Sequence, residues 1–268
     1  RKDGRPLWLL ESAALVEDEA GGPPWIEGTC VDITERKAME EELQRAKNLE
    51  TVGMIAGGVA HEVRNPLFAI TTIVTALQRK LADHPEFGEY VRHIVDQTGR
   101  LNALMTDLLT LGKPVEETAF VPVALQEVLR RCFELARKSA PGECPCTLEL
   151  PEEPLDVMGK ADQLVQVFLN LMQNAVSFTQ PGGQVRVRAW REGARAIVTV
   201  SDEGPGIAEA LLPRLFQPFQ TGRKGGTGLG LAIVRKIVHA HHGLVEAVNN
   251  DPPPGSTFTV TLPLHGGA

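Results

Sequence analysis

The stretch MEEELQRAKNLETVGMIAGGVAHEVRNPLFAITTIVTALQRKL, residues 39–81, has an apolar residue or glycine at every third or fourth position. These positions are Met39, Leu43, Ala46, Leu49, Gly53, Ala56, Ala60, Val63, Leu67, Ile70, Val74, Leu77 and Leu81. The spacing is the period of an α-helix. Its unbroken length indicates a coiled coil or a bundle helix rather than a short helix packed inside one domain.

A second stripe with the same period runs from Phe87 to Leu108, after a short turn around His84-Pro85. A short loop between two long amphipathic segments predicts an antiparallel helical hairpin. One hairpin cannot bury its apolar stripe on both sides. The sequence therefore predicts a homodimer in which two hairpins form a four-helix bundle.

The pattern changes after a polar, proline-containing segment, residues 113–119, which we interpret as a linker. Helices are expected at 126–139, 162–179 and 228–242, with Asp162 as the N-cap of the second. Strands are expected at 184–191, 196–202, 244–248 and 257–262. Helices mixed with strands, without strict alternation, are typical of an α+β sandwich of about 150 residues. The predicted fold class is therefore α+β, a long helical hairpin forming a dimeric four-helix bundle followed by an α/β sandwich.

The N-terminal segment, residues 1–36, is predicted to form strands at 6–16 and 25–33, separated by a Gly-Gly-Pro-Pro turn. Two strands alone are only marginally stable in water. We therefore expect this segment to be the end of a larger domain.

Composition limits the function classes. Lys plus Arg number 27 and Asp plus Glu 34, a formal net charge of −7, which disfavours nucleic-acid binding. No apolar run reaches the ~18–20 residues that span a bilayer, and no signal peptide is evident. The 4 cysteines are too few for a disulfide scaffold and favour a reducing, cytoplasmic setting. Cys144-Pro145-Cys146 could bind a metal or act in redox chemistry, although a proline-rich loop explains it more simply.

His61 lies at the edge of the first apolar stripe, with Glu62 beside it and Asn65 one turn later on the same face. Pro66 follows, and proline inside an ordinary helix costs about 3 kcal/mol. A kink beside a histidine and a carboxylate suggests a functional site. A surface histidine beside a surface glutamate is the simpler alternative, and these residues alone do not decide between the two.

Two polar motifs in the C-terminal half are candidates for binding. Asn170 and Asn174 share one face of the helix expected at 162–179, which faces either solvent or a hydrogen-bonding ligand. Asp202 shares its face with Val198 and Val200, so its carboxylate is expected to point into an apolar layer and to need a donor. That donor could be a backbone amide, a water or the amino group of a purine. An ordinary β-turn after a strand is the alternative.

A glycine-rich loop, Gly225-Gly226-Thr227-Gly228-Leu229-Gly230, precedes the last expected helix. Its amides, together with the N-terminus of that helix, can cradle an anion. Arg223 and Lys224 add positive charge beside it. The loop lacks the Gly-Lys-Ser/Thr of a Walker motif.

In this order and spacing, the motifs resemble those of bacterial sensor histidine kinases over residues 33–264. The quoted segments are similar to the H box, N box, first glycine box, F box, second glycine box and final strand motif of that family. They are, in that order, His61–Leu67, Asn170–Ala175, Asp202–Gly206, Phe216–Phe219, Gly226–Leu231 and Gly255–Phe258. Residues 1–36 resemble the C-terminal end of a PAS sensor domain.

The resemblance implies a domain order. It begins with the PAS remnant at 1–36 and a coiled-coil signalling helix at 37–50. A dimerisation and histidine phosphotransfer domain at 51–112 follows, then the linker at 113–119 and a catalytic ATP-binding domain at 120–268. The activity implied is autophosphorylation of His61 by ATP, followed by transfer to an aspartate of a response regulator receiver domain. Glu62 would orient the imidazole and take its proton, and Asn65 would orient water if the kinase also acts as a phosphatase.

The resemblance also implies ATP and Mg²⁺ as cofactors. Asn174 would ligate Mg²⁺. Asp202 would accept a hydrogen bond from the adenine amino group, with Thr257 nearby. Ser177 stands where the family often has a basic residue, which bears on the phosphate contacts of this helix. The other implied nucleotide-binding residues are Asn170, Gly204, Gly206, Arg223, Lys224, Gly226, Thr227, Gly228, Leu229 and Gly230.

Two other function classes compete with a kinase. Gyrase and mismatch-repair ATPases share the nucleotide fold but carry a glutamate where Asn170 stands, and an amide cannot take a proton, which disfavours hydrolysis as the main activity. A scaffold that only dimerises is the second alternative, and failure to bind a fluorescent ATP analogue would favour it. We expect a cytoplasmic chain with no membrane span of its own, and a membrane anchor before Arg1 stays open.

Overall fold

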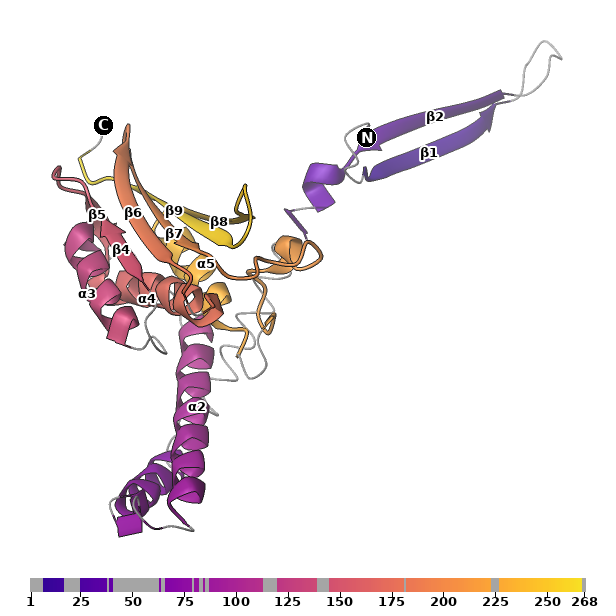
Figure 1. The fold of residues 1–268 in the computed structure, drawn as a ribbon. Helices are drawn as coiled ribbons and strands as arrows, with labels where there is room; N and C mark the ends of the chain where they lie inside the picture. The colour runs from indigo at the N-terminus through magenta and orange to yellow at the C-terminus, as the bar shows by residue number, and fades with distance from the viewer. Residues whose placement is uncertain are drawn as a thin grey trace.

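The computed structural model describes residues 7–16, 25–37, 39–40, 63, 66–78, 80–81, 84, 87–112, 120–138, 145–180, 182–222 and 227–266. Figure 1 shows three parts along the chain: a strand pair near the N-terminus, a helical hairpin, and an α/β unit at the C-terminal end. The described residues include no helix that is long and apolar enough to cross a membrane.

The N-terminal strands are β1 (Leu9–Val16) and β2 (Trp25–Asp32), which pair antiparallel. Both expected strands are thus confirmed, each a residue or more shorter than predicted. Two hydrogen bonds to Thr34 join the pair to the helical residues 34–37: Trp8 N–H donates to Thr34 Oγ1 at 3.0 Å, and Thr34 N–H donates to Asp32 Oδ1 at 2.9 Å. The prediction of one unbroken helix from 34 to 81 falls largely on residues outside the described ranges.

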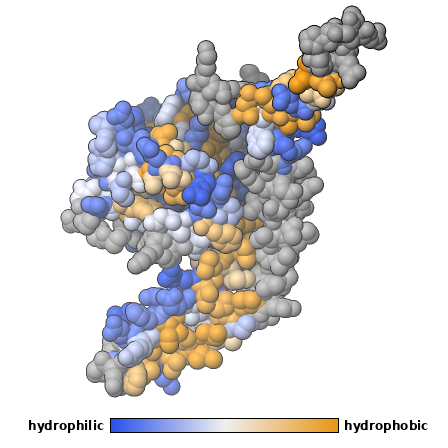
Figure 2. Space-filling view, turned by 90° about the vertical axis from the view of Figure 1, so that its right-hand side faces the viewer, coloured by the Kyte–Doolittle hydropathy of each residue, from blue (hydrophilic) through white to orange (hydrophobic). Residues whose placement is uncertain are grey.

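The helical hairpin combines a helix at residues 66–78 with α2 (Gly88–Gly112). The two helices contact one another through Asn102, whose Nδ2 donates to Thr71 Oγ1 at 3.3 Å. Buried residues on the hairpin include Leu67, Val74 and Val91. Several large apolar side chains are nevertheless exposed on it: Phe68, Ile70, Ile73, Leu77, Tyr90, Ile94 and Leu101. Figure 2 shows hydrophobic residues gathered on this lower, helical part of the molecule.

The α/β unit contains a sheet of five strands in the order β4-β6-β7-β9-β8. They are β4 (Cys146–Glu149), β6 (Val185–Glu192), β7 (Arg195–Asp202), β9 (Ser256–Pro263) and β8 (Leu244–Asn249). β4 and β6 are parallel, and the other neighbours are antiparallel. A second, two-stranded sheet pairs β3 (Val121–Ala124) with β5 (Asp156–Gly159). The strand expected at 257–262 extends one residue in each direction.

Three helices cover one face of the five-stranded sheet (Figure 1). They are α3 (Leu125–Lys138), α4 (Ala161–Phe178) and α5 (Gly230–Ala240). The expected α+β sandwich is therefore confirmed. The helices cover the face on which β6 and β9 bury alternate side chains.

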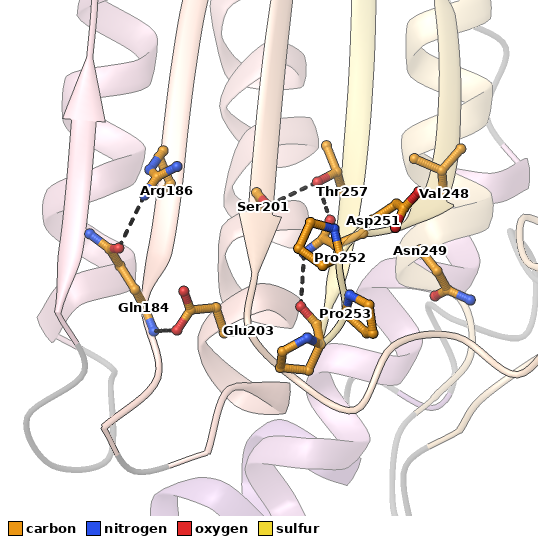
Figure 3. A pocket seen from close by; sticks show the side chains of 12 residues that line it. Gln184, Arg186, Ser201, Glu203, Val248, Asn249, Asp251, Pro252, Pro253 and Thr257 are labelled. Carbon is orange, nitrogen blue, oxygen red and sulfur yellow. Dashed lines mark hydrogen bonds between the residues drawn. The ribbon is translucent and has the colours of Figure 1, made fainter.

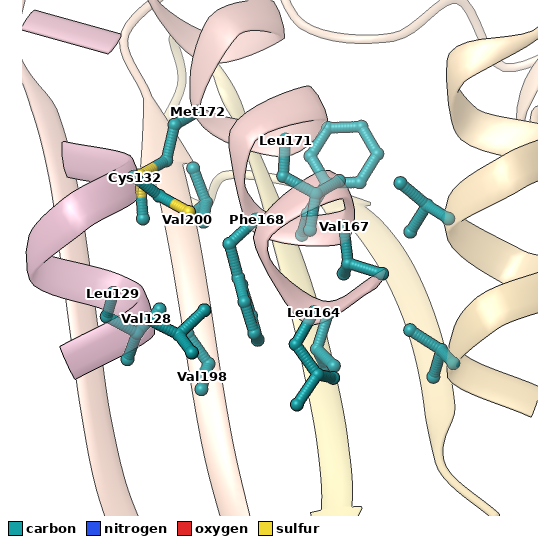
Figure 4. Packing of buried hydrophobic residues seen from close by; sticks show 14 of the residues in the cluster. Val128, Leu129, Cys132, Leu164, Val167, Phe168, Leu171, Met172, Val198 and Val200 are labelled. Atoms are coloured by element: carbon teal, nitrogen blue, oxygen red, sulfur yellow. The ribbon is translucent and has the colours of Figure 1, made fainter. Parts of the chain in front are cut away.

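The core lies between α3, α4 and the sheet (Figure 4). Phe168 of α4 is fully buried, and around it lie Leu129 and Cys132 of α3 and Val198 and Val200 of β7. Full burial of one such apolar side chain contributes roughly 1.5–3 kcal/mol relative to exposure. Burial also raises the pKa of the Cys132 thiol to about 11, so this cysteine is an inert packing residue.

The start of α4 differs from the expectation. Asp162 was predicted to be the N-cap, but the N-cap is Lys160, and its backbone N–H donates to Nε2 of the buried His241 at 3.2 Å. His241 Nδ1 donates in turn to the Ile237 carbonyl at 2.8 Å, and its ring stacks on Phe120 at 4.5 Å between centroids. A distant imidazole therefore accepts the backbone N–H of the N-cap residue, while no side chain caps the first turn of α4.

Candidate functional site

The carboxylate of Asp202 lies at the end of β7 and is buried, with 4% of the residue exposed. Its Oδ1 accepts the Gly204 N–H at 2.9 Å, and its Oδ2 accepts the Ser256 hydroxyl at 2.7 Å. The expectation that this carboxylate points inward and finds a donor is confirmed, and the donors are one backbone amide and one hydroxyl. A carboxylate has about four lone-pair sites, so Asp202 keeps capacity to accept from a ligand.

Gly204 approaches Asp202 too closely for any side chain. A Cβ on Gly204 would lie 2.8 Å from Asp202 Oδ1 and 2.8 Å from the backbone oxygen of Phe178. The backbone of the turn is held from the other side as well, because Asn250 Nδ2 donates to the Asp202 carbonyl at 2.9 Å. The glycine in the Asp-x-Gly motif is thus a packing requirement of the site.

Thr257 does not lie beside the Asp202 carboxylate, so that prediction is wrong. Its hydroxyl donates to Asn250 Oδ1 at 2.7 Å and lies 2.8 Å from Ser201 Oγ, on the outer face of the sheet. The residue that meets Asp202 is Ser256, which the sequence analysis missed. The alternation along β9 could have found it, because Ser256 shares its face with the buried Phe258.

A cavity of about 710 Å³ lies on the outer face, where Thr257 sits (Figure 3). Arg186, Ser201 and Thr257 line it from three neighbouring strands, and the loop at residues 251–254 closes one side. The Asp202 side chain points to the opposite, helix-covered face of the sheet. This cavity is therefore separate from the Asp202 site.

The two asparagines of α4 have different surroundings. Asn170 Nδ2 donates to the Gly230 carbonyl at 3.3 Å, which ties α4 to the first residue of α5. Asn174 lies one turn further along α4 and is half-buried. Within the described ranges, no group forms a hydrogen bond with the Asn174 amide. This amide is therefore available to a ligand or to water.

The described part of the second glycine motif packs against the F-box turn. Gly228 has a φ of 67°, and its carbonyl accepts the Phe219 N–H at 2.8 Å. A Cβ on Gly228 would lie 2.6 Å from the Phe219 carbonyl carbon, so only glycine fits there. Leu229 N–H donates to Thr227 Oγ1 at 3.2 Å. Because Gly228 has a positive φ, α5 begins at Gly230 and not at Gly228 as expected.

The structure thus brings several predicted residues to one end of the α/β unit, around the turn after β7 and the start of α5. Gly206, with a φ of 77°, belongs to the same turn. The next residue, Ile207, is held by the Asn249 side chain, which accepts the Ile207 N–H and donates to the Ile207 carbonyl. Other predicted site residues lie outside the described residues: His61, Glu62, Asn65, Arg223, Lys224 and Gly226.

Two families of domain match the chain. Residues 159–266 match the family described as histidine kinase-, DNA gyrase B-, and HSP90-like ATPase. Residues 52–117 match the His Kinase A (phospho-acceptor) domain. The first match contains the Asp202 site, and the second contains His61.

Curated relatives agree with these matches. The chain is 31% identical to sporulation kinase E of Bacillus subtilis over 240 residues, which are 88% of the chain and 32% of that kinase. It is 32% identical over 275 residues to the sensory histidine kinase/phosphatase NtrB of Vibrio alginolyticus, covering 98% of the chain and 76% of NtrB. The chain belongs to the sensor histidine kinases. It spans about a third to a half of the first curated relatives that it matches.

Solved structures share the fold. A crystal structure of full-length ShkA in complex with AMPPNP matches with a TM-score of 0.68 and 28% identity, over 80% of this chain and 47% of ShkA. The structure of histidine kinase ThkA in complex with the response regulator TrrA matches with a TM-score of 0.60 and 27% identity, over 96% of this chain and 75% of that one.

Proposed function

We propose that the chain is the kinase core of a two-component sensor, which transfers the γ-phosphoryl group of ATP to His61 and then to an aspartate of a response regulator. The observation that carries the proposal is the buried Asp202 carboxylate. Two donors hold it, and it can still accept a further hydrogen bond. Packing of a strand does not require a buried carboxylate. Residues 159–266 match a family of nucleotide-binding domains, in which such a carboxylate can bind the nucleotide.

ATP would bind at the end of the sheet where Asp202 lies. The unused lone pairs of Asp202 would accept from the amino group of adenine, and Ser256 and Gly204 would hold the carboxylate in place. The phosphates would lie toward the second glycine loop, where Thr227 to Gly230 and the α5 N-terminus offer backbone amides. Arg223, Lys224 and Gly226 would extend this phosphate site.

Asn174 would hold Mg²⁺ through its amide oxygen. The fit is supported by the half-buried Asn174 amide, which lacks a partner among the described residues, and by the preference of Mg²⁺ for oxygen ligands and retained waters. When bound, Mg²⁺ would neutralise charge on the phosphates. Asn170 supports the same end of α4 through its bond to Gly230. An amide cannot take a proton, so Asn170 is unsuited to a gyrase-like role as a hydrolytic base.

The phosphoryl acceptor would be one ring nitrogen of His61. That nitrogen attacks the γ-phosphorus, the bond to the β-phosphate oxygen breaks, and ADP leaves. Glu62 would accept the proton of the other ring nitrogen, which keeps the attacking nitrogen nucleophilic. Catalysis of such in-line transfer is mostly positioning and charge neutralisation. Asn65 would orient a water if the protein also removes phosphate from its regulator, as the name of NtrB says of that relative.

The hairpin would act as a homodimer. Its exposed apolar face, which includes Phe68, Ile73 and Ile94, would be buried by a second copy to form a four-helix bundle. The domain order proposed is the one expected from the sequence: a PAS remnant at 1–36, a coiled-coil helix at 37–50, phosphotransfer at 51–112, a linker at 113–119 and ATP binding at 120–268. A cytoplasmic location and a receiver-domain partner complete the proposal, and ThkA is a relative solved with such a regulator.

Incubation with γ-labelled ATP and Mg²⁺ tests the proposal. We expect label on the protein that is labile in acid and stable in alkali, as a phosphohistidine is, and we expect His61→Gln to lack it. His93→Gln, which changes an exposed histidine of α2, is the matched control and should be labelled normally. Label that survives in His61→Gln would contradict the assignment. A chain that binds no fluorescent ATP analogue would favour a scaffold instead.

A further inference from the structure

The turn that follows β7 runs from Asp202 to Ile207, and two side chains at the end of β8 hold both of its ends. Asn250 Nδ2 donates to the Asp202 carbonyl at 2.9 Å. Asn249 Oδ1 accepts the Ile207 N–H at 2.7 Å, and Asn249 Nδ2 donates to the Ile207 carbonyl at 2.8 Å. None of the motifs quoted from the sequence contains either asparagine, although both hold the turn that contains the first glycine motif.

The Asn250 bond lies just past the end of the ladder between β7 and β9. The last paired residues at this end are Ser201 and Thr257, so the Asp202 carbonyl lies one residue beyond the ladder. The backbone of Gly255 comes directly against this carbonyl, because a Cβ on Gly255 would lie 1.8 Å from the Asp202 oxygen. The Asn250 amide therefore supplies a donor to Asp202 at the point where strand pairing has ended.

The loop between β8 and β9 gives a reason why a side chain supplies this donor. Residues 252–254 are three consecutive prolines, which have no backbone N–H to donate. Asn250 also bonds to the loop itself: its Nδ2 donates to the Pro254 carbonyl at 3.2 Å, and its backbone N–H donates to the Gly255 carbonyl at 3.0 Å. One amide, with both of its hydrogens used, thus joins the proline loop to the Asp202 turn.

The acceptor side of the same amide faces the outer surface of the sheet. Asn250 Oδ1 accepts the Thr257 hydroxyl at 2.7 Å, and this hydroxyl lies 2.8 Å from Ser201 Oγ (Figure 3). The two carbonyls that accept from Nδ2 already fix which end of the amide points toward Asp202. A substitution that removes the Asn250 donors can therefore be compared with one at Thr257, which removes only the bond on the acceptor side.

The backbone position of Asp202 decides where its carboxylate lies. Oδ1 accepts the Gly204 N–H from the same turn at 2.9 Å, and Oδ2 accepts the Ser256 hydroxyl from β9 at 2.7 Å. Movement of the turn relative to β9 would disturb this arrangement, and Asn250 opposes that movement by bonding to Asp202 from the β8–β9 loop. A group that is fixed before its ligand arrives binds with a smaller loss of conformational freedom.

We propose that Asn249 and Asn250 are positioning residues of the nucleotide site, which hold the turn at 202–207 so that the Asp202 carboxylate is directed at the amino group of adenine before ATP binds. The inference rests on the proposed function, because it takes Asp202 as the acceptor of that amino group. It goes further in assigning part of the selectivity for adenine to two side chains outside the site. Asn250, which bonds to Asp202 itself, makes the larger contribution.

Two nucleotides that differ by one amino group test the proposal. ATP and purine riboside triphosphate, which lacks the 6-amino group, are competed against a fluorescent ATP analogue on the full chain. We expect Asn250→Ala to weaken ATP binding about fivefold or more and binding of the other nucleotide less than about twofold, because only ATP uses the Asp202 acceptor. Asn250→Asp retains the side-chain shape and the acceptor for Thr257, and should lose at least as much affinity for ATP. Equal losses for the two nucleotides would overturn the proposal.

Thr257→Val is the matched control, because it removes the hydroxyl on the acceptor side of Asn250 and leaves both donor bonds in place. It should change neither affinity by more than about twofold. Asn249→Ala should weaken ATP binding about two- to threefold and leave the other nucleotide unchanged, because Asn249 holds the far end of the turn. A loss of ATP preference in Thr257→Val as large as in Asn250→Ala would overturn the role of the Asn250 donors. An unchanged preference in Asn249→Ala would overturn the role of Asn249.

Hydrogen exchange of the nucleotide-free protein, followed by NMR, separates this inference from the proposed function. We expect the Gly204 amide to exchange faster in Asn250→Ala and the Ile207 amide to exchange faster in Asn249→Ala, whereas Thr257→Val should leave both rates unchanged. Equal Gly204 rates in Asn250→Ala and the wild type would overturn the positioning role. A wild-type chain that binds the two nucleotides equally would refute the adenine contact of the proposed function. The exchange rates would still decide whether the asparagines hold the turn.

Discussion

The α/β unit and the helical hairpin bury their apolar residues in different ways. In the α/β unit, the large side chains of α4 that face the sheet are fully buried within one chain, Phe168 and Leu171 among them. On the hairpin, Phe68 is 72% exposed and Tyr90 is 67% exposed. The α/β unit closes its core by itself, whereas the hairpin presents an apolar face with the helical period that none of the described residues covers. The comparison indicates that the α/β unit contains the binding site, whereas the hairpin contains the surface through which two copies assemble.

Truncation in the closed core should have the largest effect. Phe168→Ala removes a ring with 0% exposure, and we expect the free energy of unfolding of the α/β unit to fall by about 3–5 kcal/mol. Denaturant unfolding followed by circular dichroism measures it. Phe68→Ala, the matched change on the hairpin, should leave this transition within about 0.5 kcal/mol. Equal losses from the two variants would break the contrast between the regions.

A charge on the exposed apolar face of the hairpin should act on assembly instead. We expect Ile94→Asp to raise the dimer dissociation constant at least about 100-fold, or roughly 2.7 kcal/mol, because it buries an unpaired charge between two copies. Sedimentation velocity measures the shift from dimer to monomer. Gln97→Asp adds the same charge at an exposed polar position of α2 and is the control. A dimer that persists in Ile94→Asp would place the interface elsewhere.

The two faces of β9 allow a smaller, sharper test inside the closed region. Ser256→Ala removes a donor to the buried Asp202 carboxylate, and bonds to charged groups contribute about 1.5–3 kcal/mol, so we expect at least tenfold weaker binding of an ATP analogue. Thr257→Val removes a hydroxyl that bonds only on the outer face and should change affinity less than twofold. A larger loss of affinity in Thr257→Val than in Ser256→Ala would place Thr257 in the binding site and exclude Ser256.

His241 should give the smallest effect, and only in acid. Burial lowers its pKa below the ordinary value of 6.5, while the Ile237 carbonyl and Asp162 oppose that shift in part. The unfolded chain therefore binds a proton that the folded chain excludes, and protonation would set Nε2 against the Lys160 N–H. Stability should be complete above pH 6.5 and fall as the pH drops below it, by at most about 1.4 kcal/mol per pH unit from this group.

Thermal unfolding of the α/β unit across this pH range measures the effect. His241→Gln should flatten the profile below pH 6.5, whereas His239→Gln, an exposed histidine of the same helix, should leave it unchanged. A profile that stays equally steep in His241→Gln would assign the acid sensitivity to another group.

Much of the fold and part of the site followed from local patterns. The helical period predicted the amphipathic hairpin, and strand alternation placed Asp202 on the same inward face as Val198 and Val200. The order and spacing of the motifs were specific enough to indicate the family, which the comparisons confirm. The prediction for Thr257 was wrong, although the same alternation rule could have corrected it. Ser256, and not Thr257, lies on the same face of β9 as the buried Phe258.

Other features needed contacts between residues far apart in the chain. No local pattern near Asp162 shows that His241, 81 residues after Lys160, accepts the Lys160 N–H at the start of α4. None joins Lys236 of α5 to the carbonyls at the end of α2. Periodicity and motif spacing are read from neighbours in sequence, so they specify the elements, their inward faces and the family. The partners of buried polar groups depend on which distant atoms the packed chain brings within hydrogen-bonding distance, and only the folded molecule decides that.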